Sequence, residues 1–115
     1  MAITYEQAKT EVEEIIASNK YVFFTASWCP DCVYLKEVFS SHGVLDKFYI
    51  WELSRYEKGT DDYKTYCQVW FEQAFGQQNI PLLFVDGVYL GTEHQVRSWE
   101  KHNKTDEKLK QLGLK

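Results

Sequence analysis

Hydrophobic and polar residues follow two different periods along this chain. In five segments apolar residues recur every three or four positions, which is typical of helices with one buried face. Four shorter segments are apolar or alternating, as strands are. The predicted order is helix 4–18, strand 21–27, helix 33–41, strand 47–53, a helix from Thr60 to a stop at Gly76, strand 80–85, strand 88–90, a helix from Thr92 and a short helix from Thr105.

Capping and turn residues support several of these boundaries. Two pairs have the spacing of a capping box, Thr4 with Gln7 and Thr92 with Gln95. Thr105 is expected to cap the last helix, and Asp86-Gly87 between two apolar runs predicts a tight hairpin. The resulting order predicts an α/β fold, with a four-stranded mixed sheet and helices on both of its faces.

Length and charge narrow the class of protein. The chain has 115 residues, and we expect one domain over 1–115. The net charge of −4 argues against nucleic-acid binding, which favours a basic face. No apolar run is long enough to cross a bilayer, and the first residues lack the pattern of a signal peptide. We therefore expect a cytoplasmic protein, in a compartment where thiols are kept reduced.

The most informative chemistry is the tetrad Cys29-Pro30-Asp31-Cys32, which follows the first predicted strand. A cysteine between a strand and a helix lies where unpaired N–H groups and the helix dipole favour negative charge. Cys29 is therefore the candidate nucleophile. Asp31 opposes this effect because a nearby carboxylate disfavours a second negative charge, whereas Pro30 suits a first helical turn.

A metal site is the alternative chemistry for two cysteines at this spacing. A structural zinc site needs two further ligands, and the chain has no second spaced pair. Cys67 with a histidine could be recruited, but no spacing suggests it, so a redox role is favoured. We expect Cys67 to be an inert core thiol on the apolar face of its helix, where Tyr63 is also expected in the core.

Three features resemble the thioredoxin superfamily and, within it, the glutaredoxins. The first is the CxxC tetrad at a strand-to-helix turn. The second is Ile80-Pro81, about fifty residues later at the start of a strand. The third is the segment 90–96, Leu-Gly-Thr-Glu-His-Gln-Val, which resembles the Ile-Gly-Gly-x-x-Asp-Leu of glutaredoxins. The similarity covers roughly residues 22–99, and Trp28 with the tetrad resembles a fungal glutaredoxin-like group.

The resemblance implies a thioredoxin/glutaredoxin fold and a thiol–disulfide oxidoreductase. Cys29 would be the nucleophile and Cys32 the resolving thiol, and the two would form a redox-active disulfide. The Ile80-Pro81 bond would be cis, and the backbone of Ile80 would pair with a bound peptide or with glutathione. Glutathione would be a co-substrate, with no tightly bound cofactor. The other partners would be disulfide-containing or glutathionylated proteins, with no nucleic acid or membrane, and the protein would be a monomer.

The candidate contacts for glutathione or a protein substrate are Trp28, Pro30, Asp31, Ile80, Pro81, Gly91, Thr92 and Glu93. Thr92 and Glu93 open a helix, whose N-terminus can bind a carboxylate, but a simple helix cap is equally consistent with these residues. Four departures from the family pattern predict weaker handling of glutathione. Asp31 stands where a Tyr is usual, Ser27 stands where a Lys is usual, Thr92 replaces a glycine and Gln95 replaces an Asp.

Three alternatives stay open. Trp28 before the tetrad is also a thioredoxin feature, so the protein could be a disulfide reductase supplied by thioredoxin reductase, although Phe23 replaces the buried Asp of thioredoxins. A carrier of a [2Fe–2S] cluster and a non-catalytic binding module are the others. The redox interpretation requires that the Cys29 sulfur is accessible and not buried away from solvent, and that no structural metal holds it together with Cys32.

Overall fold

The computed structural model describes residues 2–76 and 80–115. Its sheet has the strand order β2-β1-β3-β4, with β1 at Tyr21–Thr25, β2 at Tyr49–Glu52, β3 at Leu82–Val85 and β4 at Val88–Gly91. β2 runs parallel to β1, whereas β3 is antiparallel to both β1 and β4. The predicted four-stranded mixed sheet is confirmed.

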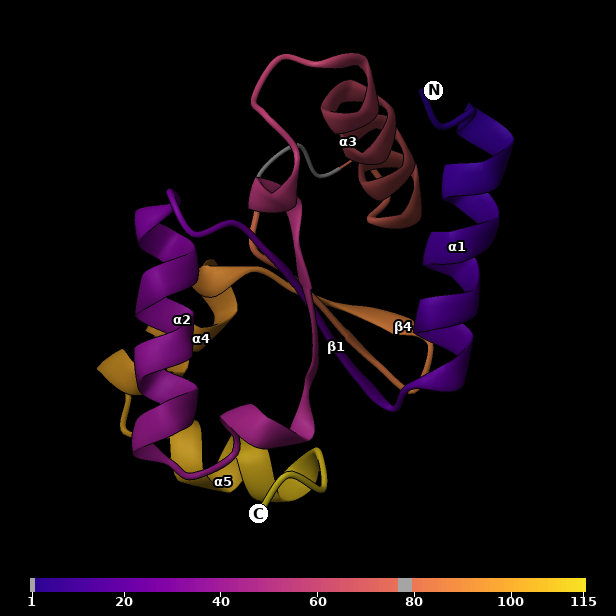
Figure 1. Ribbon diagram of the computed structural model, residues 1–115. Coiled ribbons are helices and arrows are strands. Elements are labelled where there is room, and N and C mark those ends of the chain that lie inside the picture. Colours follow the sequence, from indigo (N-terminus) through magenta and orange to yellow (C-terminus); the bar gives the residue numbers. More distant parts are fainter. Residues whose placement is uncertain (1, 77–79) are drawn as a thin grey trace.

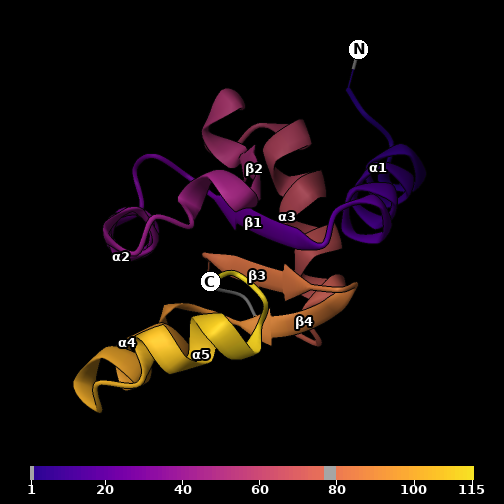
Figure 2. The ribbon, with the colours of Figure 1, turned by 90° about the horizontal axis from the view of Figure 1, so that it is seen from below.

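Helices cover both faces of this sheet, as predicted (Figures 1 and 2). One face carries α1 (Tyr5–Ser18) and α3 (Asp61–Gln73), and the other carries α2 (Pro30–Ser41), α4 (Glu93–Lys101) and α5 (Thr105–Gln111). Two 3-10 helices, η1 (Leu45–Lys47) and η2 (Leu53–Arg55), flank β2. Within the described residues, no helix combines the length and apolar character that a bilayer crossing requires.

β1 separates two hydrophobic cores, and every residue of this strand is buried. Val22 and Phe24 face α1 and α3, where they join Val12, Trp51 and Trp70. On the other face Phe23 packs with Phe39, with the ring centroids 6.0 Å apart, and with Leu35 and Leu109. Burial of one such side chain contributes about 1.5–3 kcal/mol. The strand that leads to the tetrad is therefore held from both sides.

The capping boxes and the hairpin turn lie where the sequence predicted them. Both predicted capping boxes are present, at the starts of α1 and α4. Asp86 and Gly87 have φ values of 53° and 78°, the left-handed conformations that a two-residue hairpin requires. The Asp86-Gly87 turn joins β3 and β4, which pair as an antiparallel hairpin.

Three expectations from the sequence need correction. The strand predicted over 47–53 is shorter, because 3-10 turns take up both of its ends. The helix after Cys29 begins at Pro30 and includes the last three tetrad residues. Thr105 does not cap α5, because its hydroxyl donates to Glu100 Oε2 at 2.5 Å.

Candidate active site

The turn from β1 into α2 places Cys29 at the N-cap of that helix. The Cys29 sulfur accepts a hydrogen bond from the backbone N–H of Cys32 at 3.4 Å. Pro30 is the first helical residue, where a missing N–H costs no intrahelical bond. The positive end of the α2 dipole therefore faces this sulfur.

Cys29 borders a cavity of about 290 Å³. The other residues that line this cavity are Trp28, Asp31, Leu53, Tyr63, Cys67 and Ile80. Cys29 is only 6% exposed, so most of its surface is covered, and it meets the cavity beside two partly exposed residues, Trp28 and Asp31. A substrate sulfur entering this cavity would come into contact with Cys29.

Cys32 lies deeper in the protein and is completely buried. Burial raises the pKa of the Cys32 thiol to about 12, and the neighbouring Cys29 adds to this effect. At neutral pH Cys32 is therefore a protonated thiol. Both are free thiols in the structure. Within residues 2–76 and 80–115, no three His, Cys, Asp or Glu side chains cluster in a way that could hold a metal ion.

The peptide bond between Ile80 and Pro81 is cis, as the resemblance implied. The carbonyl oxygen of Ile80 accepts the thiol hydrogen of Cys29 over a sulfur–oxygen distance of 3.7 Å. Pro81 is buried, and β3 begins at the next residue. The structure therefore brings the predicted backbone segment next to the predicted nucleophile, although these residues are about fifty positions apart.

Trp28 forms an aromatic wall of the cavity. Its side chain is exposed (45%), as expected for a substrate-facing surface. The ring lies 6.4 Å from that of Tyr63, and Lys58 Nζ lies 4.6 Å from its centroid. This cation–π contact fixes one face of the indole, so the ring offers a positioned apolar surface.

Two cavity residues on α3, Tyr63 and Cys67, were assigned to the core by sequence reasoning. Both are partly buried and line the cavity with Cys29. Burial raises the pKa of Cys67, although a hydrogen bond with Tyr63 acts in the opposite direction. The expected inert character of Cys67 agrees with this pKa, and both residues pack against the hydrophobic core while they also line the cavity. In the sequence, the only indication that Tyr63 and Cys67 lie together is their spacing, which places them one helical turn apart on a single face.

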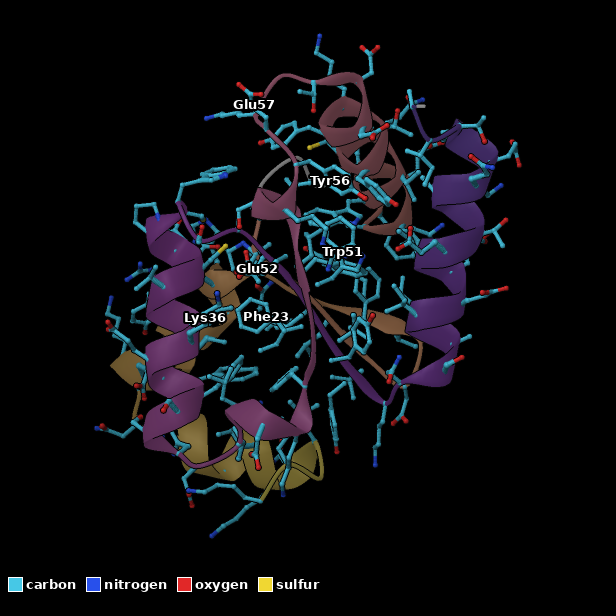
Figure 3. The ribbon with its side chains drawn as sticks, in the orientation of Figure 1. Phe23, Lys36, Trp51, Glu52, Tyr56 and Glu57 are labelled. Carbon is cyan, nitrogen blue, oxygen red and sulfur yellow. The ribbon has the colours of Figure 1, made fainter. Side chains whose placement is uncertain are left out.

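A polar network anchors the loop before the tetrad, and two of its members, Lys36 on α2 and Glu52 on β2, are labelled in Figure 3. Lys36 Nζ donates to Glu52 Oε1 at 2.7 Å, and Ser54 Oγ donates to the other carboxylate oxygen at 2.5 Å. Burial alone would raise the pKa of Glu52, but these hydrogen bonds outweigh it and the pKa lies below its usual value. The N–H of Ser27 donates to Ser54 Oγ at 3.3 Å. Ser27 therefore ties the loop to the end of β2 through its backbone.

The start of α4 forms a separate structure. Gly91, Thr92 and Glu93 are buried, and none of them lines the cavity with Cys29. The Thr92 N–H donates to Gln95 Oε1 at 2.7 Å, and the His94 N–H donates to Thr92 Oγ1 at 3.3 Å. Gly91 has a φ of 150°, and a Cβ there would collide with the Gln95 side chain. The helix-cap interpretation of Thr92 is confirmed, whereas contact of these residues with glutathione stays a prediction.

Comparison with known proteins agrees with this geometry. The family model described as Glutaredoxin matches residues 21–90. The chain belongs to the glutaredoxin family. It is 31% identical over 105 residues to Glutaredoxin-8 of Saccharomyces cerevisiae, a match that covers 91% of this chain and 94% of that protein.

Solved glutaredoxin structures share the fold. The solution structure of yeast dithiol glutaredoxin Grx8 superposes with a TM-score of 0.82 at 30% identity, covering 94% of this chain and 96% of that one. Oxidized glutaredoxin 2 from Chlamydomonas reinhardtii gives a TM-score of 0.77 at 20% identity, over 98% of this chain and all of the other. The predicted thioredoxin/glutaredoxin fold is thus established, and the family supports a thiol–disulfide oxidoreductase.

Proposed function

We propose that this glutaredoxin-family protein is a glutathione-linked dithiol oxidoreductase that reduces protein disulfides or glutathione mixed disulfides. The observation that carries this proposal is the position of the Cys29 sulfur, which caps α2, borders a cavity and lies one turn from a buried thiol. Two family members offer support, because one solved relative is described as a dithiol glutaredoxin and another as a glutaredoxin–glutathione complex.

The reaction begins when the Cys29 thiolate attacks one sulfur of a substrate disulfide. A Cys29–substrate disulfide forms, and the other substrate sulfur leaves as a thiolate that takes up a proton. Cys32 then loses its proton and attacks the Cys29 sulfur, which releases the second substrate thiolate and forms the Cys29–Cys32 disulfide. The substrate gains two electrons, and the protein loses them.

Glutathione restores the dithiol. The thiolate of one glutathione attacks Cys29, so Cys32 leaves as a thiolate and takes up a proton. A second glutathione attacks the sulfur of the first, which releases oxidised glutathione and the Cys29 thiolate. On this proposal glutathione is a co-substrate and no bound cofactor takes part. Cytoplasmic localisation and a monomeric state complete the proposal, and both rest on the sequence expectations alone.

Two assays run side by side test the function. The first measures reduction of a small glutathione mixed disulfide with glutathione as donor, and the second measures reduction of insulin disulfides with a thioredoxin reductase system. We expect activity in the first assay and less in the second. Activity only with thioredoxin reductase would replace the proposal by the thioredoxin-like alternative, and inactivity in both would favour a binding module.

A further inference from the structure

An ion pair connects the CxxC tetrad to α4, and the chemistry described above makes no use of it. Arg97 Nη2 lies 3.2 Å from Asp31 Oδ1, in the first turn of α2. The guanidinium carbon of Arg97 also lies 4.0 Å from the ring centroid of Tyr34, one turn further along α2. One side chain of α4 therefore contacts the beginning of α2 at two points.

The carboxylate of Asp31 lies where its charge can influence Cys29. Both residues line the same cavity, and only one residue separates them in the chain. A carboxylate near a thiol disfavours the thiolate, because the two negative charges repel. The Cys32 N–H and the α2 dipole act in the opposite direction. The reactivity of Cys29 thus depends on how much of the Asp31 charge is compensated.

We propose that Arg97 is a positioning residue, which compensates the charge of Asp31 and so keeps Cys29 reactive. Arg suits this place because a planar guanidinium can pair with a carboxylate and stack on a ring at the same time. The side chains of Arg97 and Asp31 are 49% and 45% exposed, so solvent and salt screen the pair and its effect is moderate. The inference rests on Cys29 being the nucleophile of the proposed function, but not on the identity of the substrate.

Other titratable groups surround the thiol, and they must stay constant in any test. Cys32 lies on α2 itself, and Tyr63 and Cys67 face the cavity from α3. Lys58 lies over the Trp28 ring at the cavity wall. A comparison that changes only Asp31 and Arg97 leaves all of these groups in place, so a difference in thiol reactivity can be assigned to the ion pair.

The test is a double-mutant cycle that follows alkylation of Cys29 by iodoacetamide across a range of pH. The wild type is compared with Arg97→Gln, Asp31→Asn and the double variant, and mass spectrometry identifies the modified cysteine. We expect Arg97→Gln to move the pH profile upward and to slow alkylation below neutral pH by about two- to threefold, the scale of an exposed ion pair. In the Asp31→Asn background the same change should have no effect. High ionic strength should reduce the difference between wild type and Arg97→Gln.

Two matched variants separate charge from structure. Lys101→Gln removes a positive charge from the last residue of the same helix and should leave the profile unchanged. Arg97→Lys keeps the charge and should restore most of the reactivity. Thermal unfolding of each variant reports any loss of the contact between α2 and α4.

Either of two results would overturn the inference: an unchanged profile in Arg97→Gln, or equal slowing with and without the Asp31 carboxylate. Alkylation needs no disulfide substrate, so this cycle gives an answer even if the proposed reductase activity is absent.

Discussion

The starts of α2 and α4 are both helix N-termini, yet they use their polar groups differently. At α2 the capping atom is the sulfur of Cys29, which borders a cavity. At α4 the capping groups are the Thr92 hydroxyl and the Gln95 amide oxygen, which bind their own backbone. On the proposed function, the same geometry therefore serves chemistry where the capping atom is the Cys29 sulfur, whereas it serves stability where that atom belongs to a hydroxyl or an amide.

The largest expected effect is the loss of disulfide reduction when the capping sulfur of Cys29 is replaced. We expect Cys29→Ser to lower disulfide reduction at least about 1000-fold, as loss of a nucleophile does in other enzymes. Stability should change little, because Ser is a good N-cap. Both reductase assays and thermal unfolding check this expectation. Cys32→Ser is the control, and it should keep the monothiol removal of glutathione. Comparable activity in the two variants would contradict the assigned roles.

The second prediction concerns the buried thiol of the pair. Burial raises the pKa of Cys32 from 9.0 to about 12, so its thiolate fraction at neutral pH falls about 1000-fold. Burial is the largest cause of this shift and persists in the Cys29→Ser variant, so we expect alkylation of Cys32 there to be far slower in the native protein than in denaturant.

The same pKa shift has a consequence for stability. Between pH 9 and about 12 the unfolded chain loses the Cys32 proton while the native protein keeps it. The contribution of this thiol to the free energy of unfolding is therefore complete below that window and falls as the pH rises through it. Urea unfolding of wild type and Cys32→Ser across this range measures the contribution. An equal pH dependence in both proteins would contradict it.

A third prediction addresses the backbone at the start of α4. Gly91→Ala should lower the free energy of unfolding by about 1–3 kcal/mol, because the left-handed φ disfavours a side chain and the new Cβ would displace Gln95. Gly59 is the matched control. It also has a positive φ, of 90°, but nothing lies within 4 Å of a Cβ there. Urea unfolding should show a smaller loss for Gly59→Ala, and alkylation of Cys29 should not change in either variant.

The smallest effect on stability is expected when the Thr92 cap of α4 is removed. Thr92→Ala should cost about 1 kcal/mol of stability, as loss of an N-cap side chain usually does. Thr4→Ala at α1 breaks an equivalent capping box and should cost a similar amount. The KM for a glutathione mixed disulfide tests the predicted contact of Thr92 with glutathione, which should raise the KM in Thr92→Ala. An unchanged KM would show that this residue serves only as a helix cap.

Features with short-range causes could be predicted from the sequence. The capping boxes, the Asp86-Gly87 hairpin and the place of Cys29 at a strand-to-helix turn each depend on a few neighbouring residues. Errors arose where a second group competes locally. The Thr105 hydroxyl binds Glu100 instead of its own helix end.

The rest of the site depends on contacts between segments far apart in the chain. Arg97 and Asp31 are 66 positions apart, and Lys36 and Glu52 are 16 apart. Nothing in the local pattern around either partner indicates the other. Tyr63 and Cys67 were assigned to the core because a cavity wall and a core show the same apolar helical face. Only the packing of α3 over the thiol distinguishes the two cases.

The central strand β1 contributes side chains to both hydrophobic layers, and it also leads directly to the turn that carries the Cys29 thiol. Because successive side chains of β1 enter opposite layers, deletion of one residue would reverse which side chains enter each layer from there to the end of the strand. The same deletion would shorten the segment that joins the sheet to Cys29. Length changes in this strand should therefore be tolerated far less well than conservative substitutions, and they should abolish folding and the proposed reductase activity together.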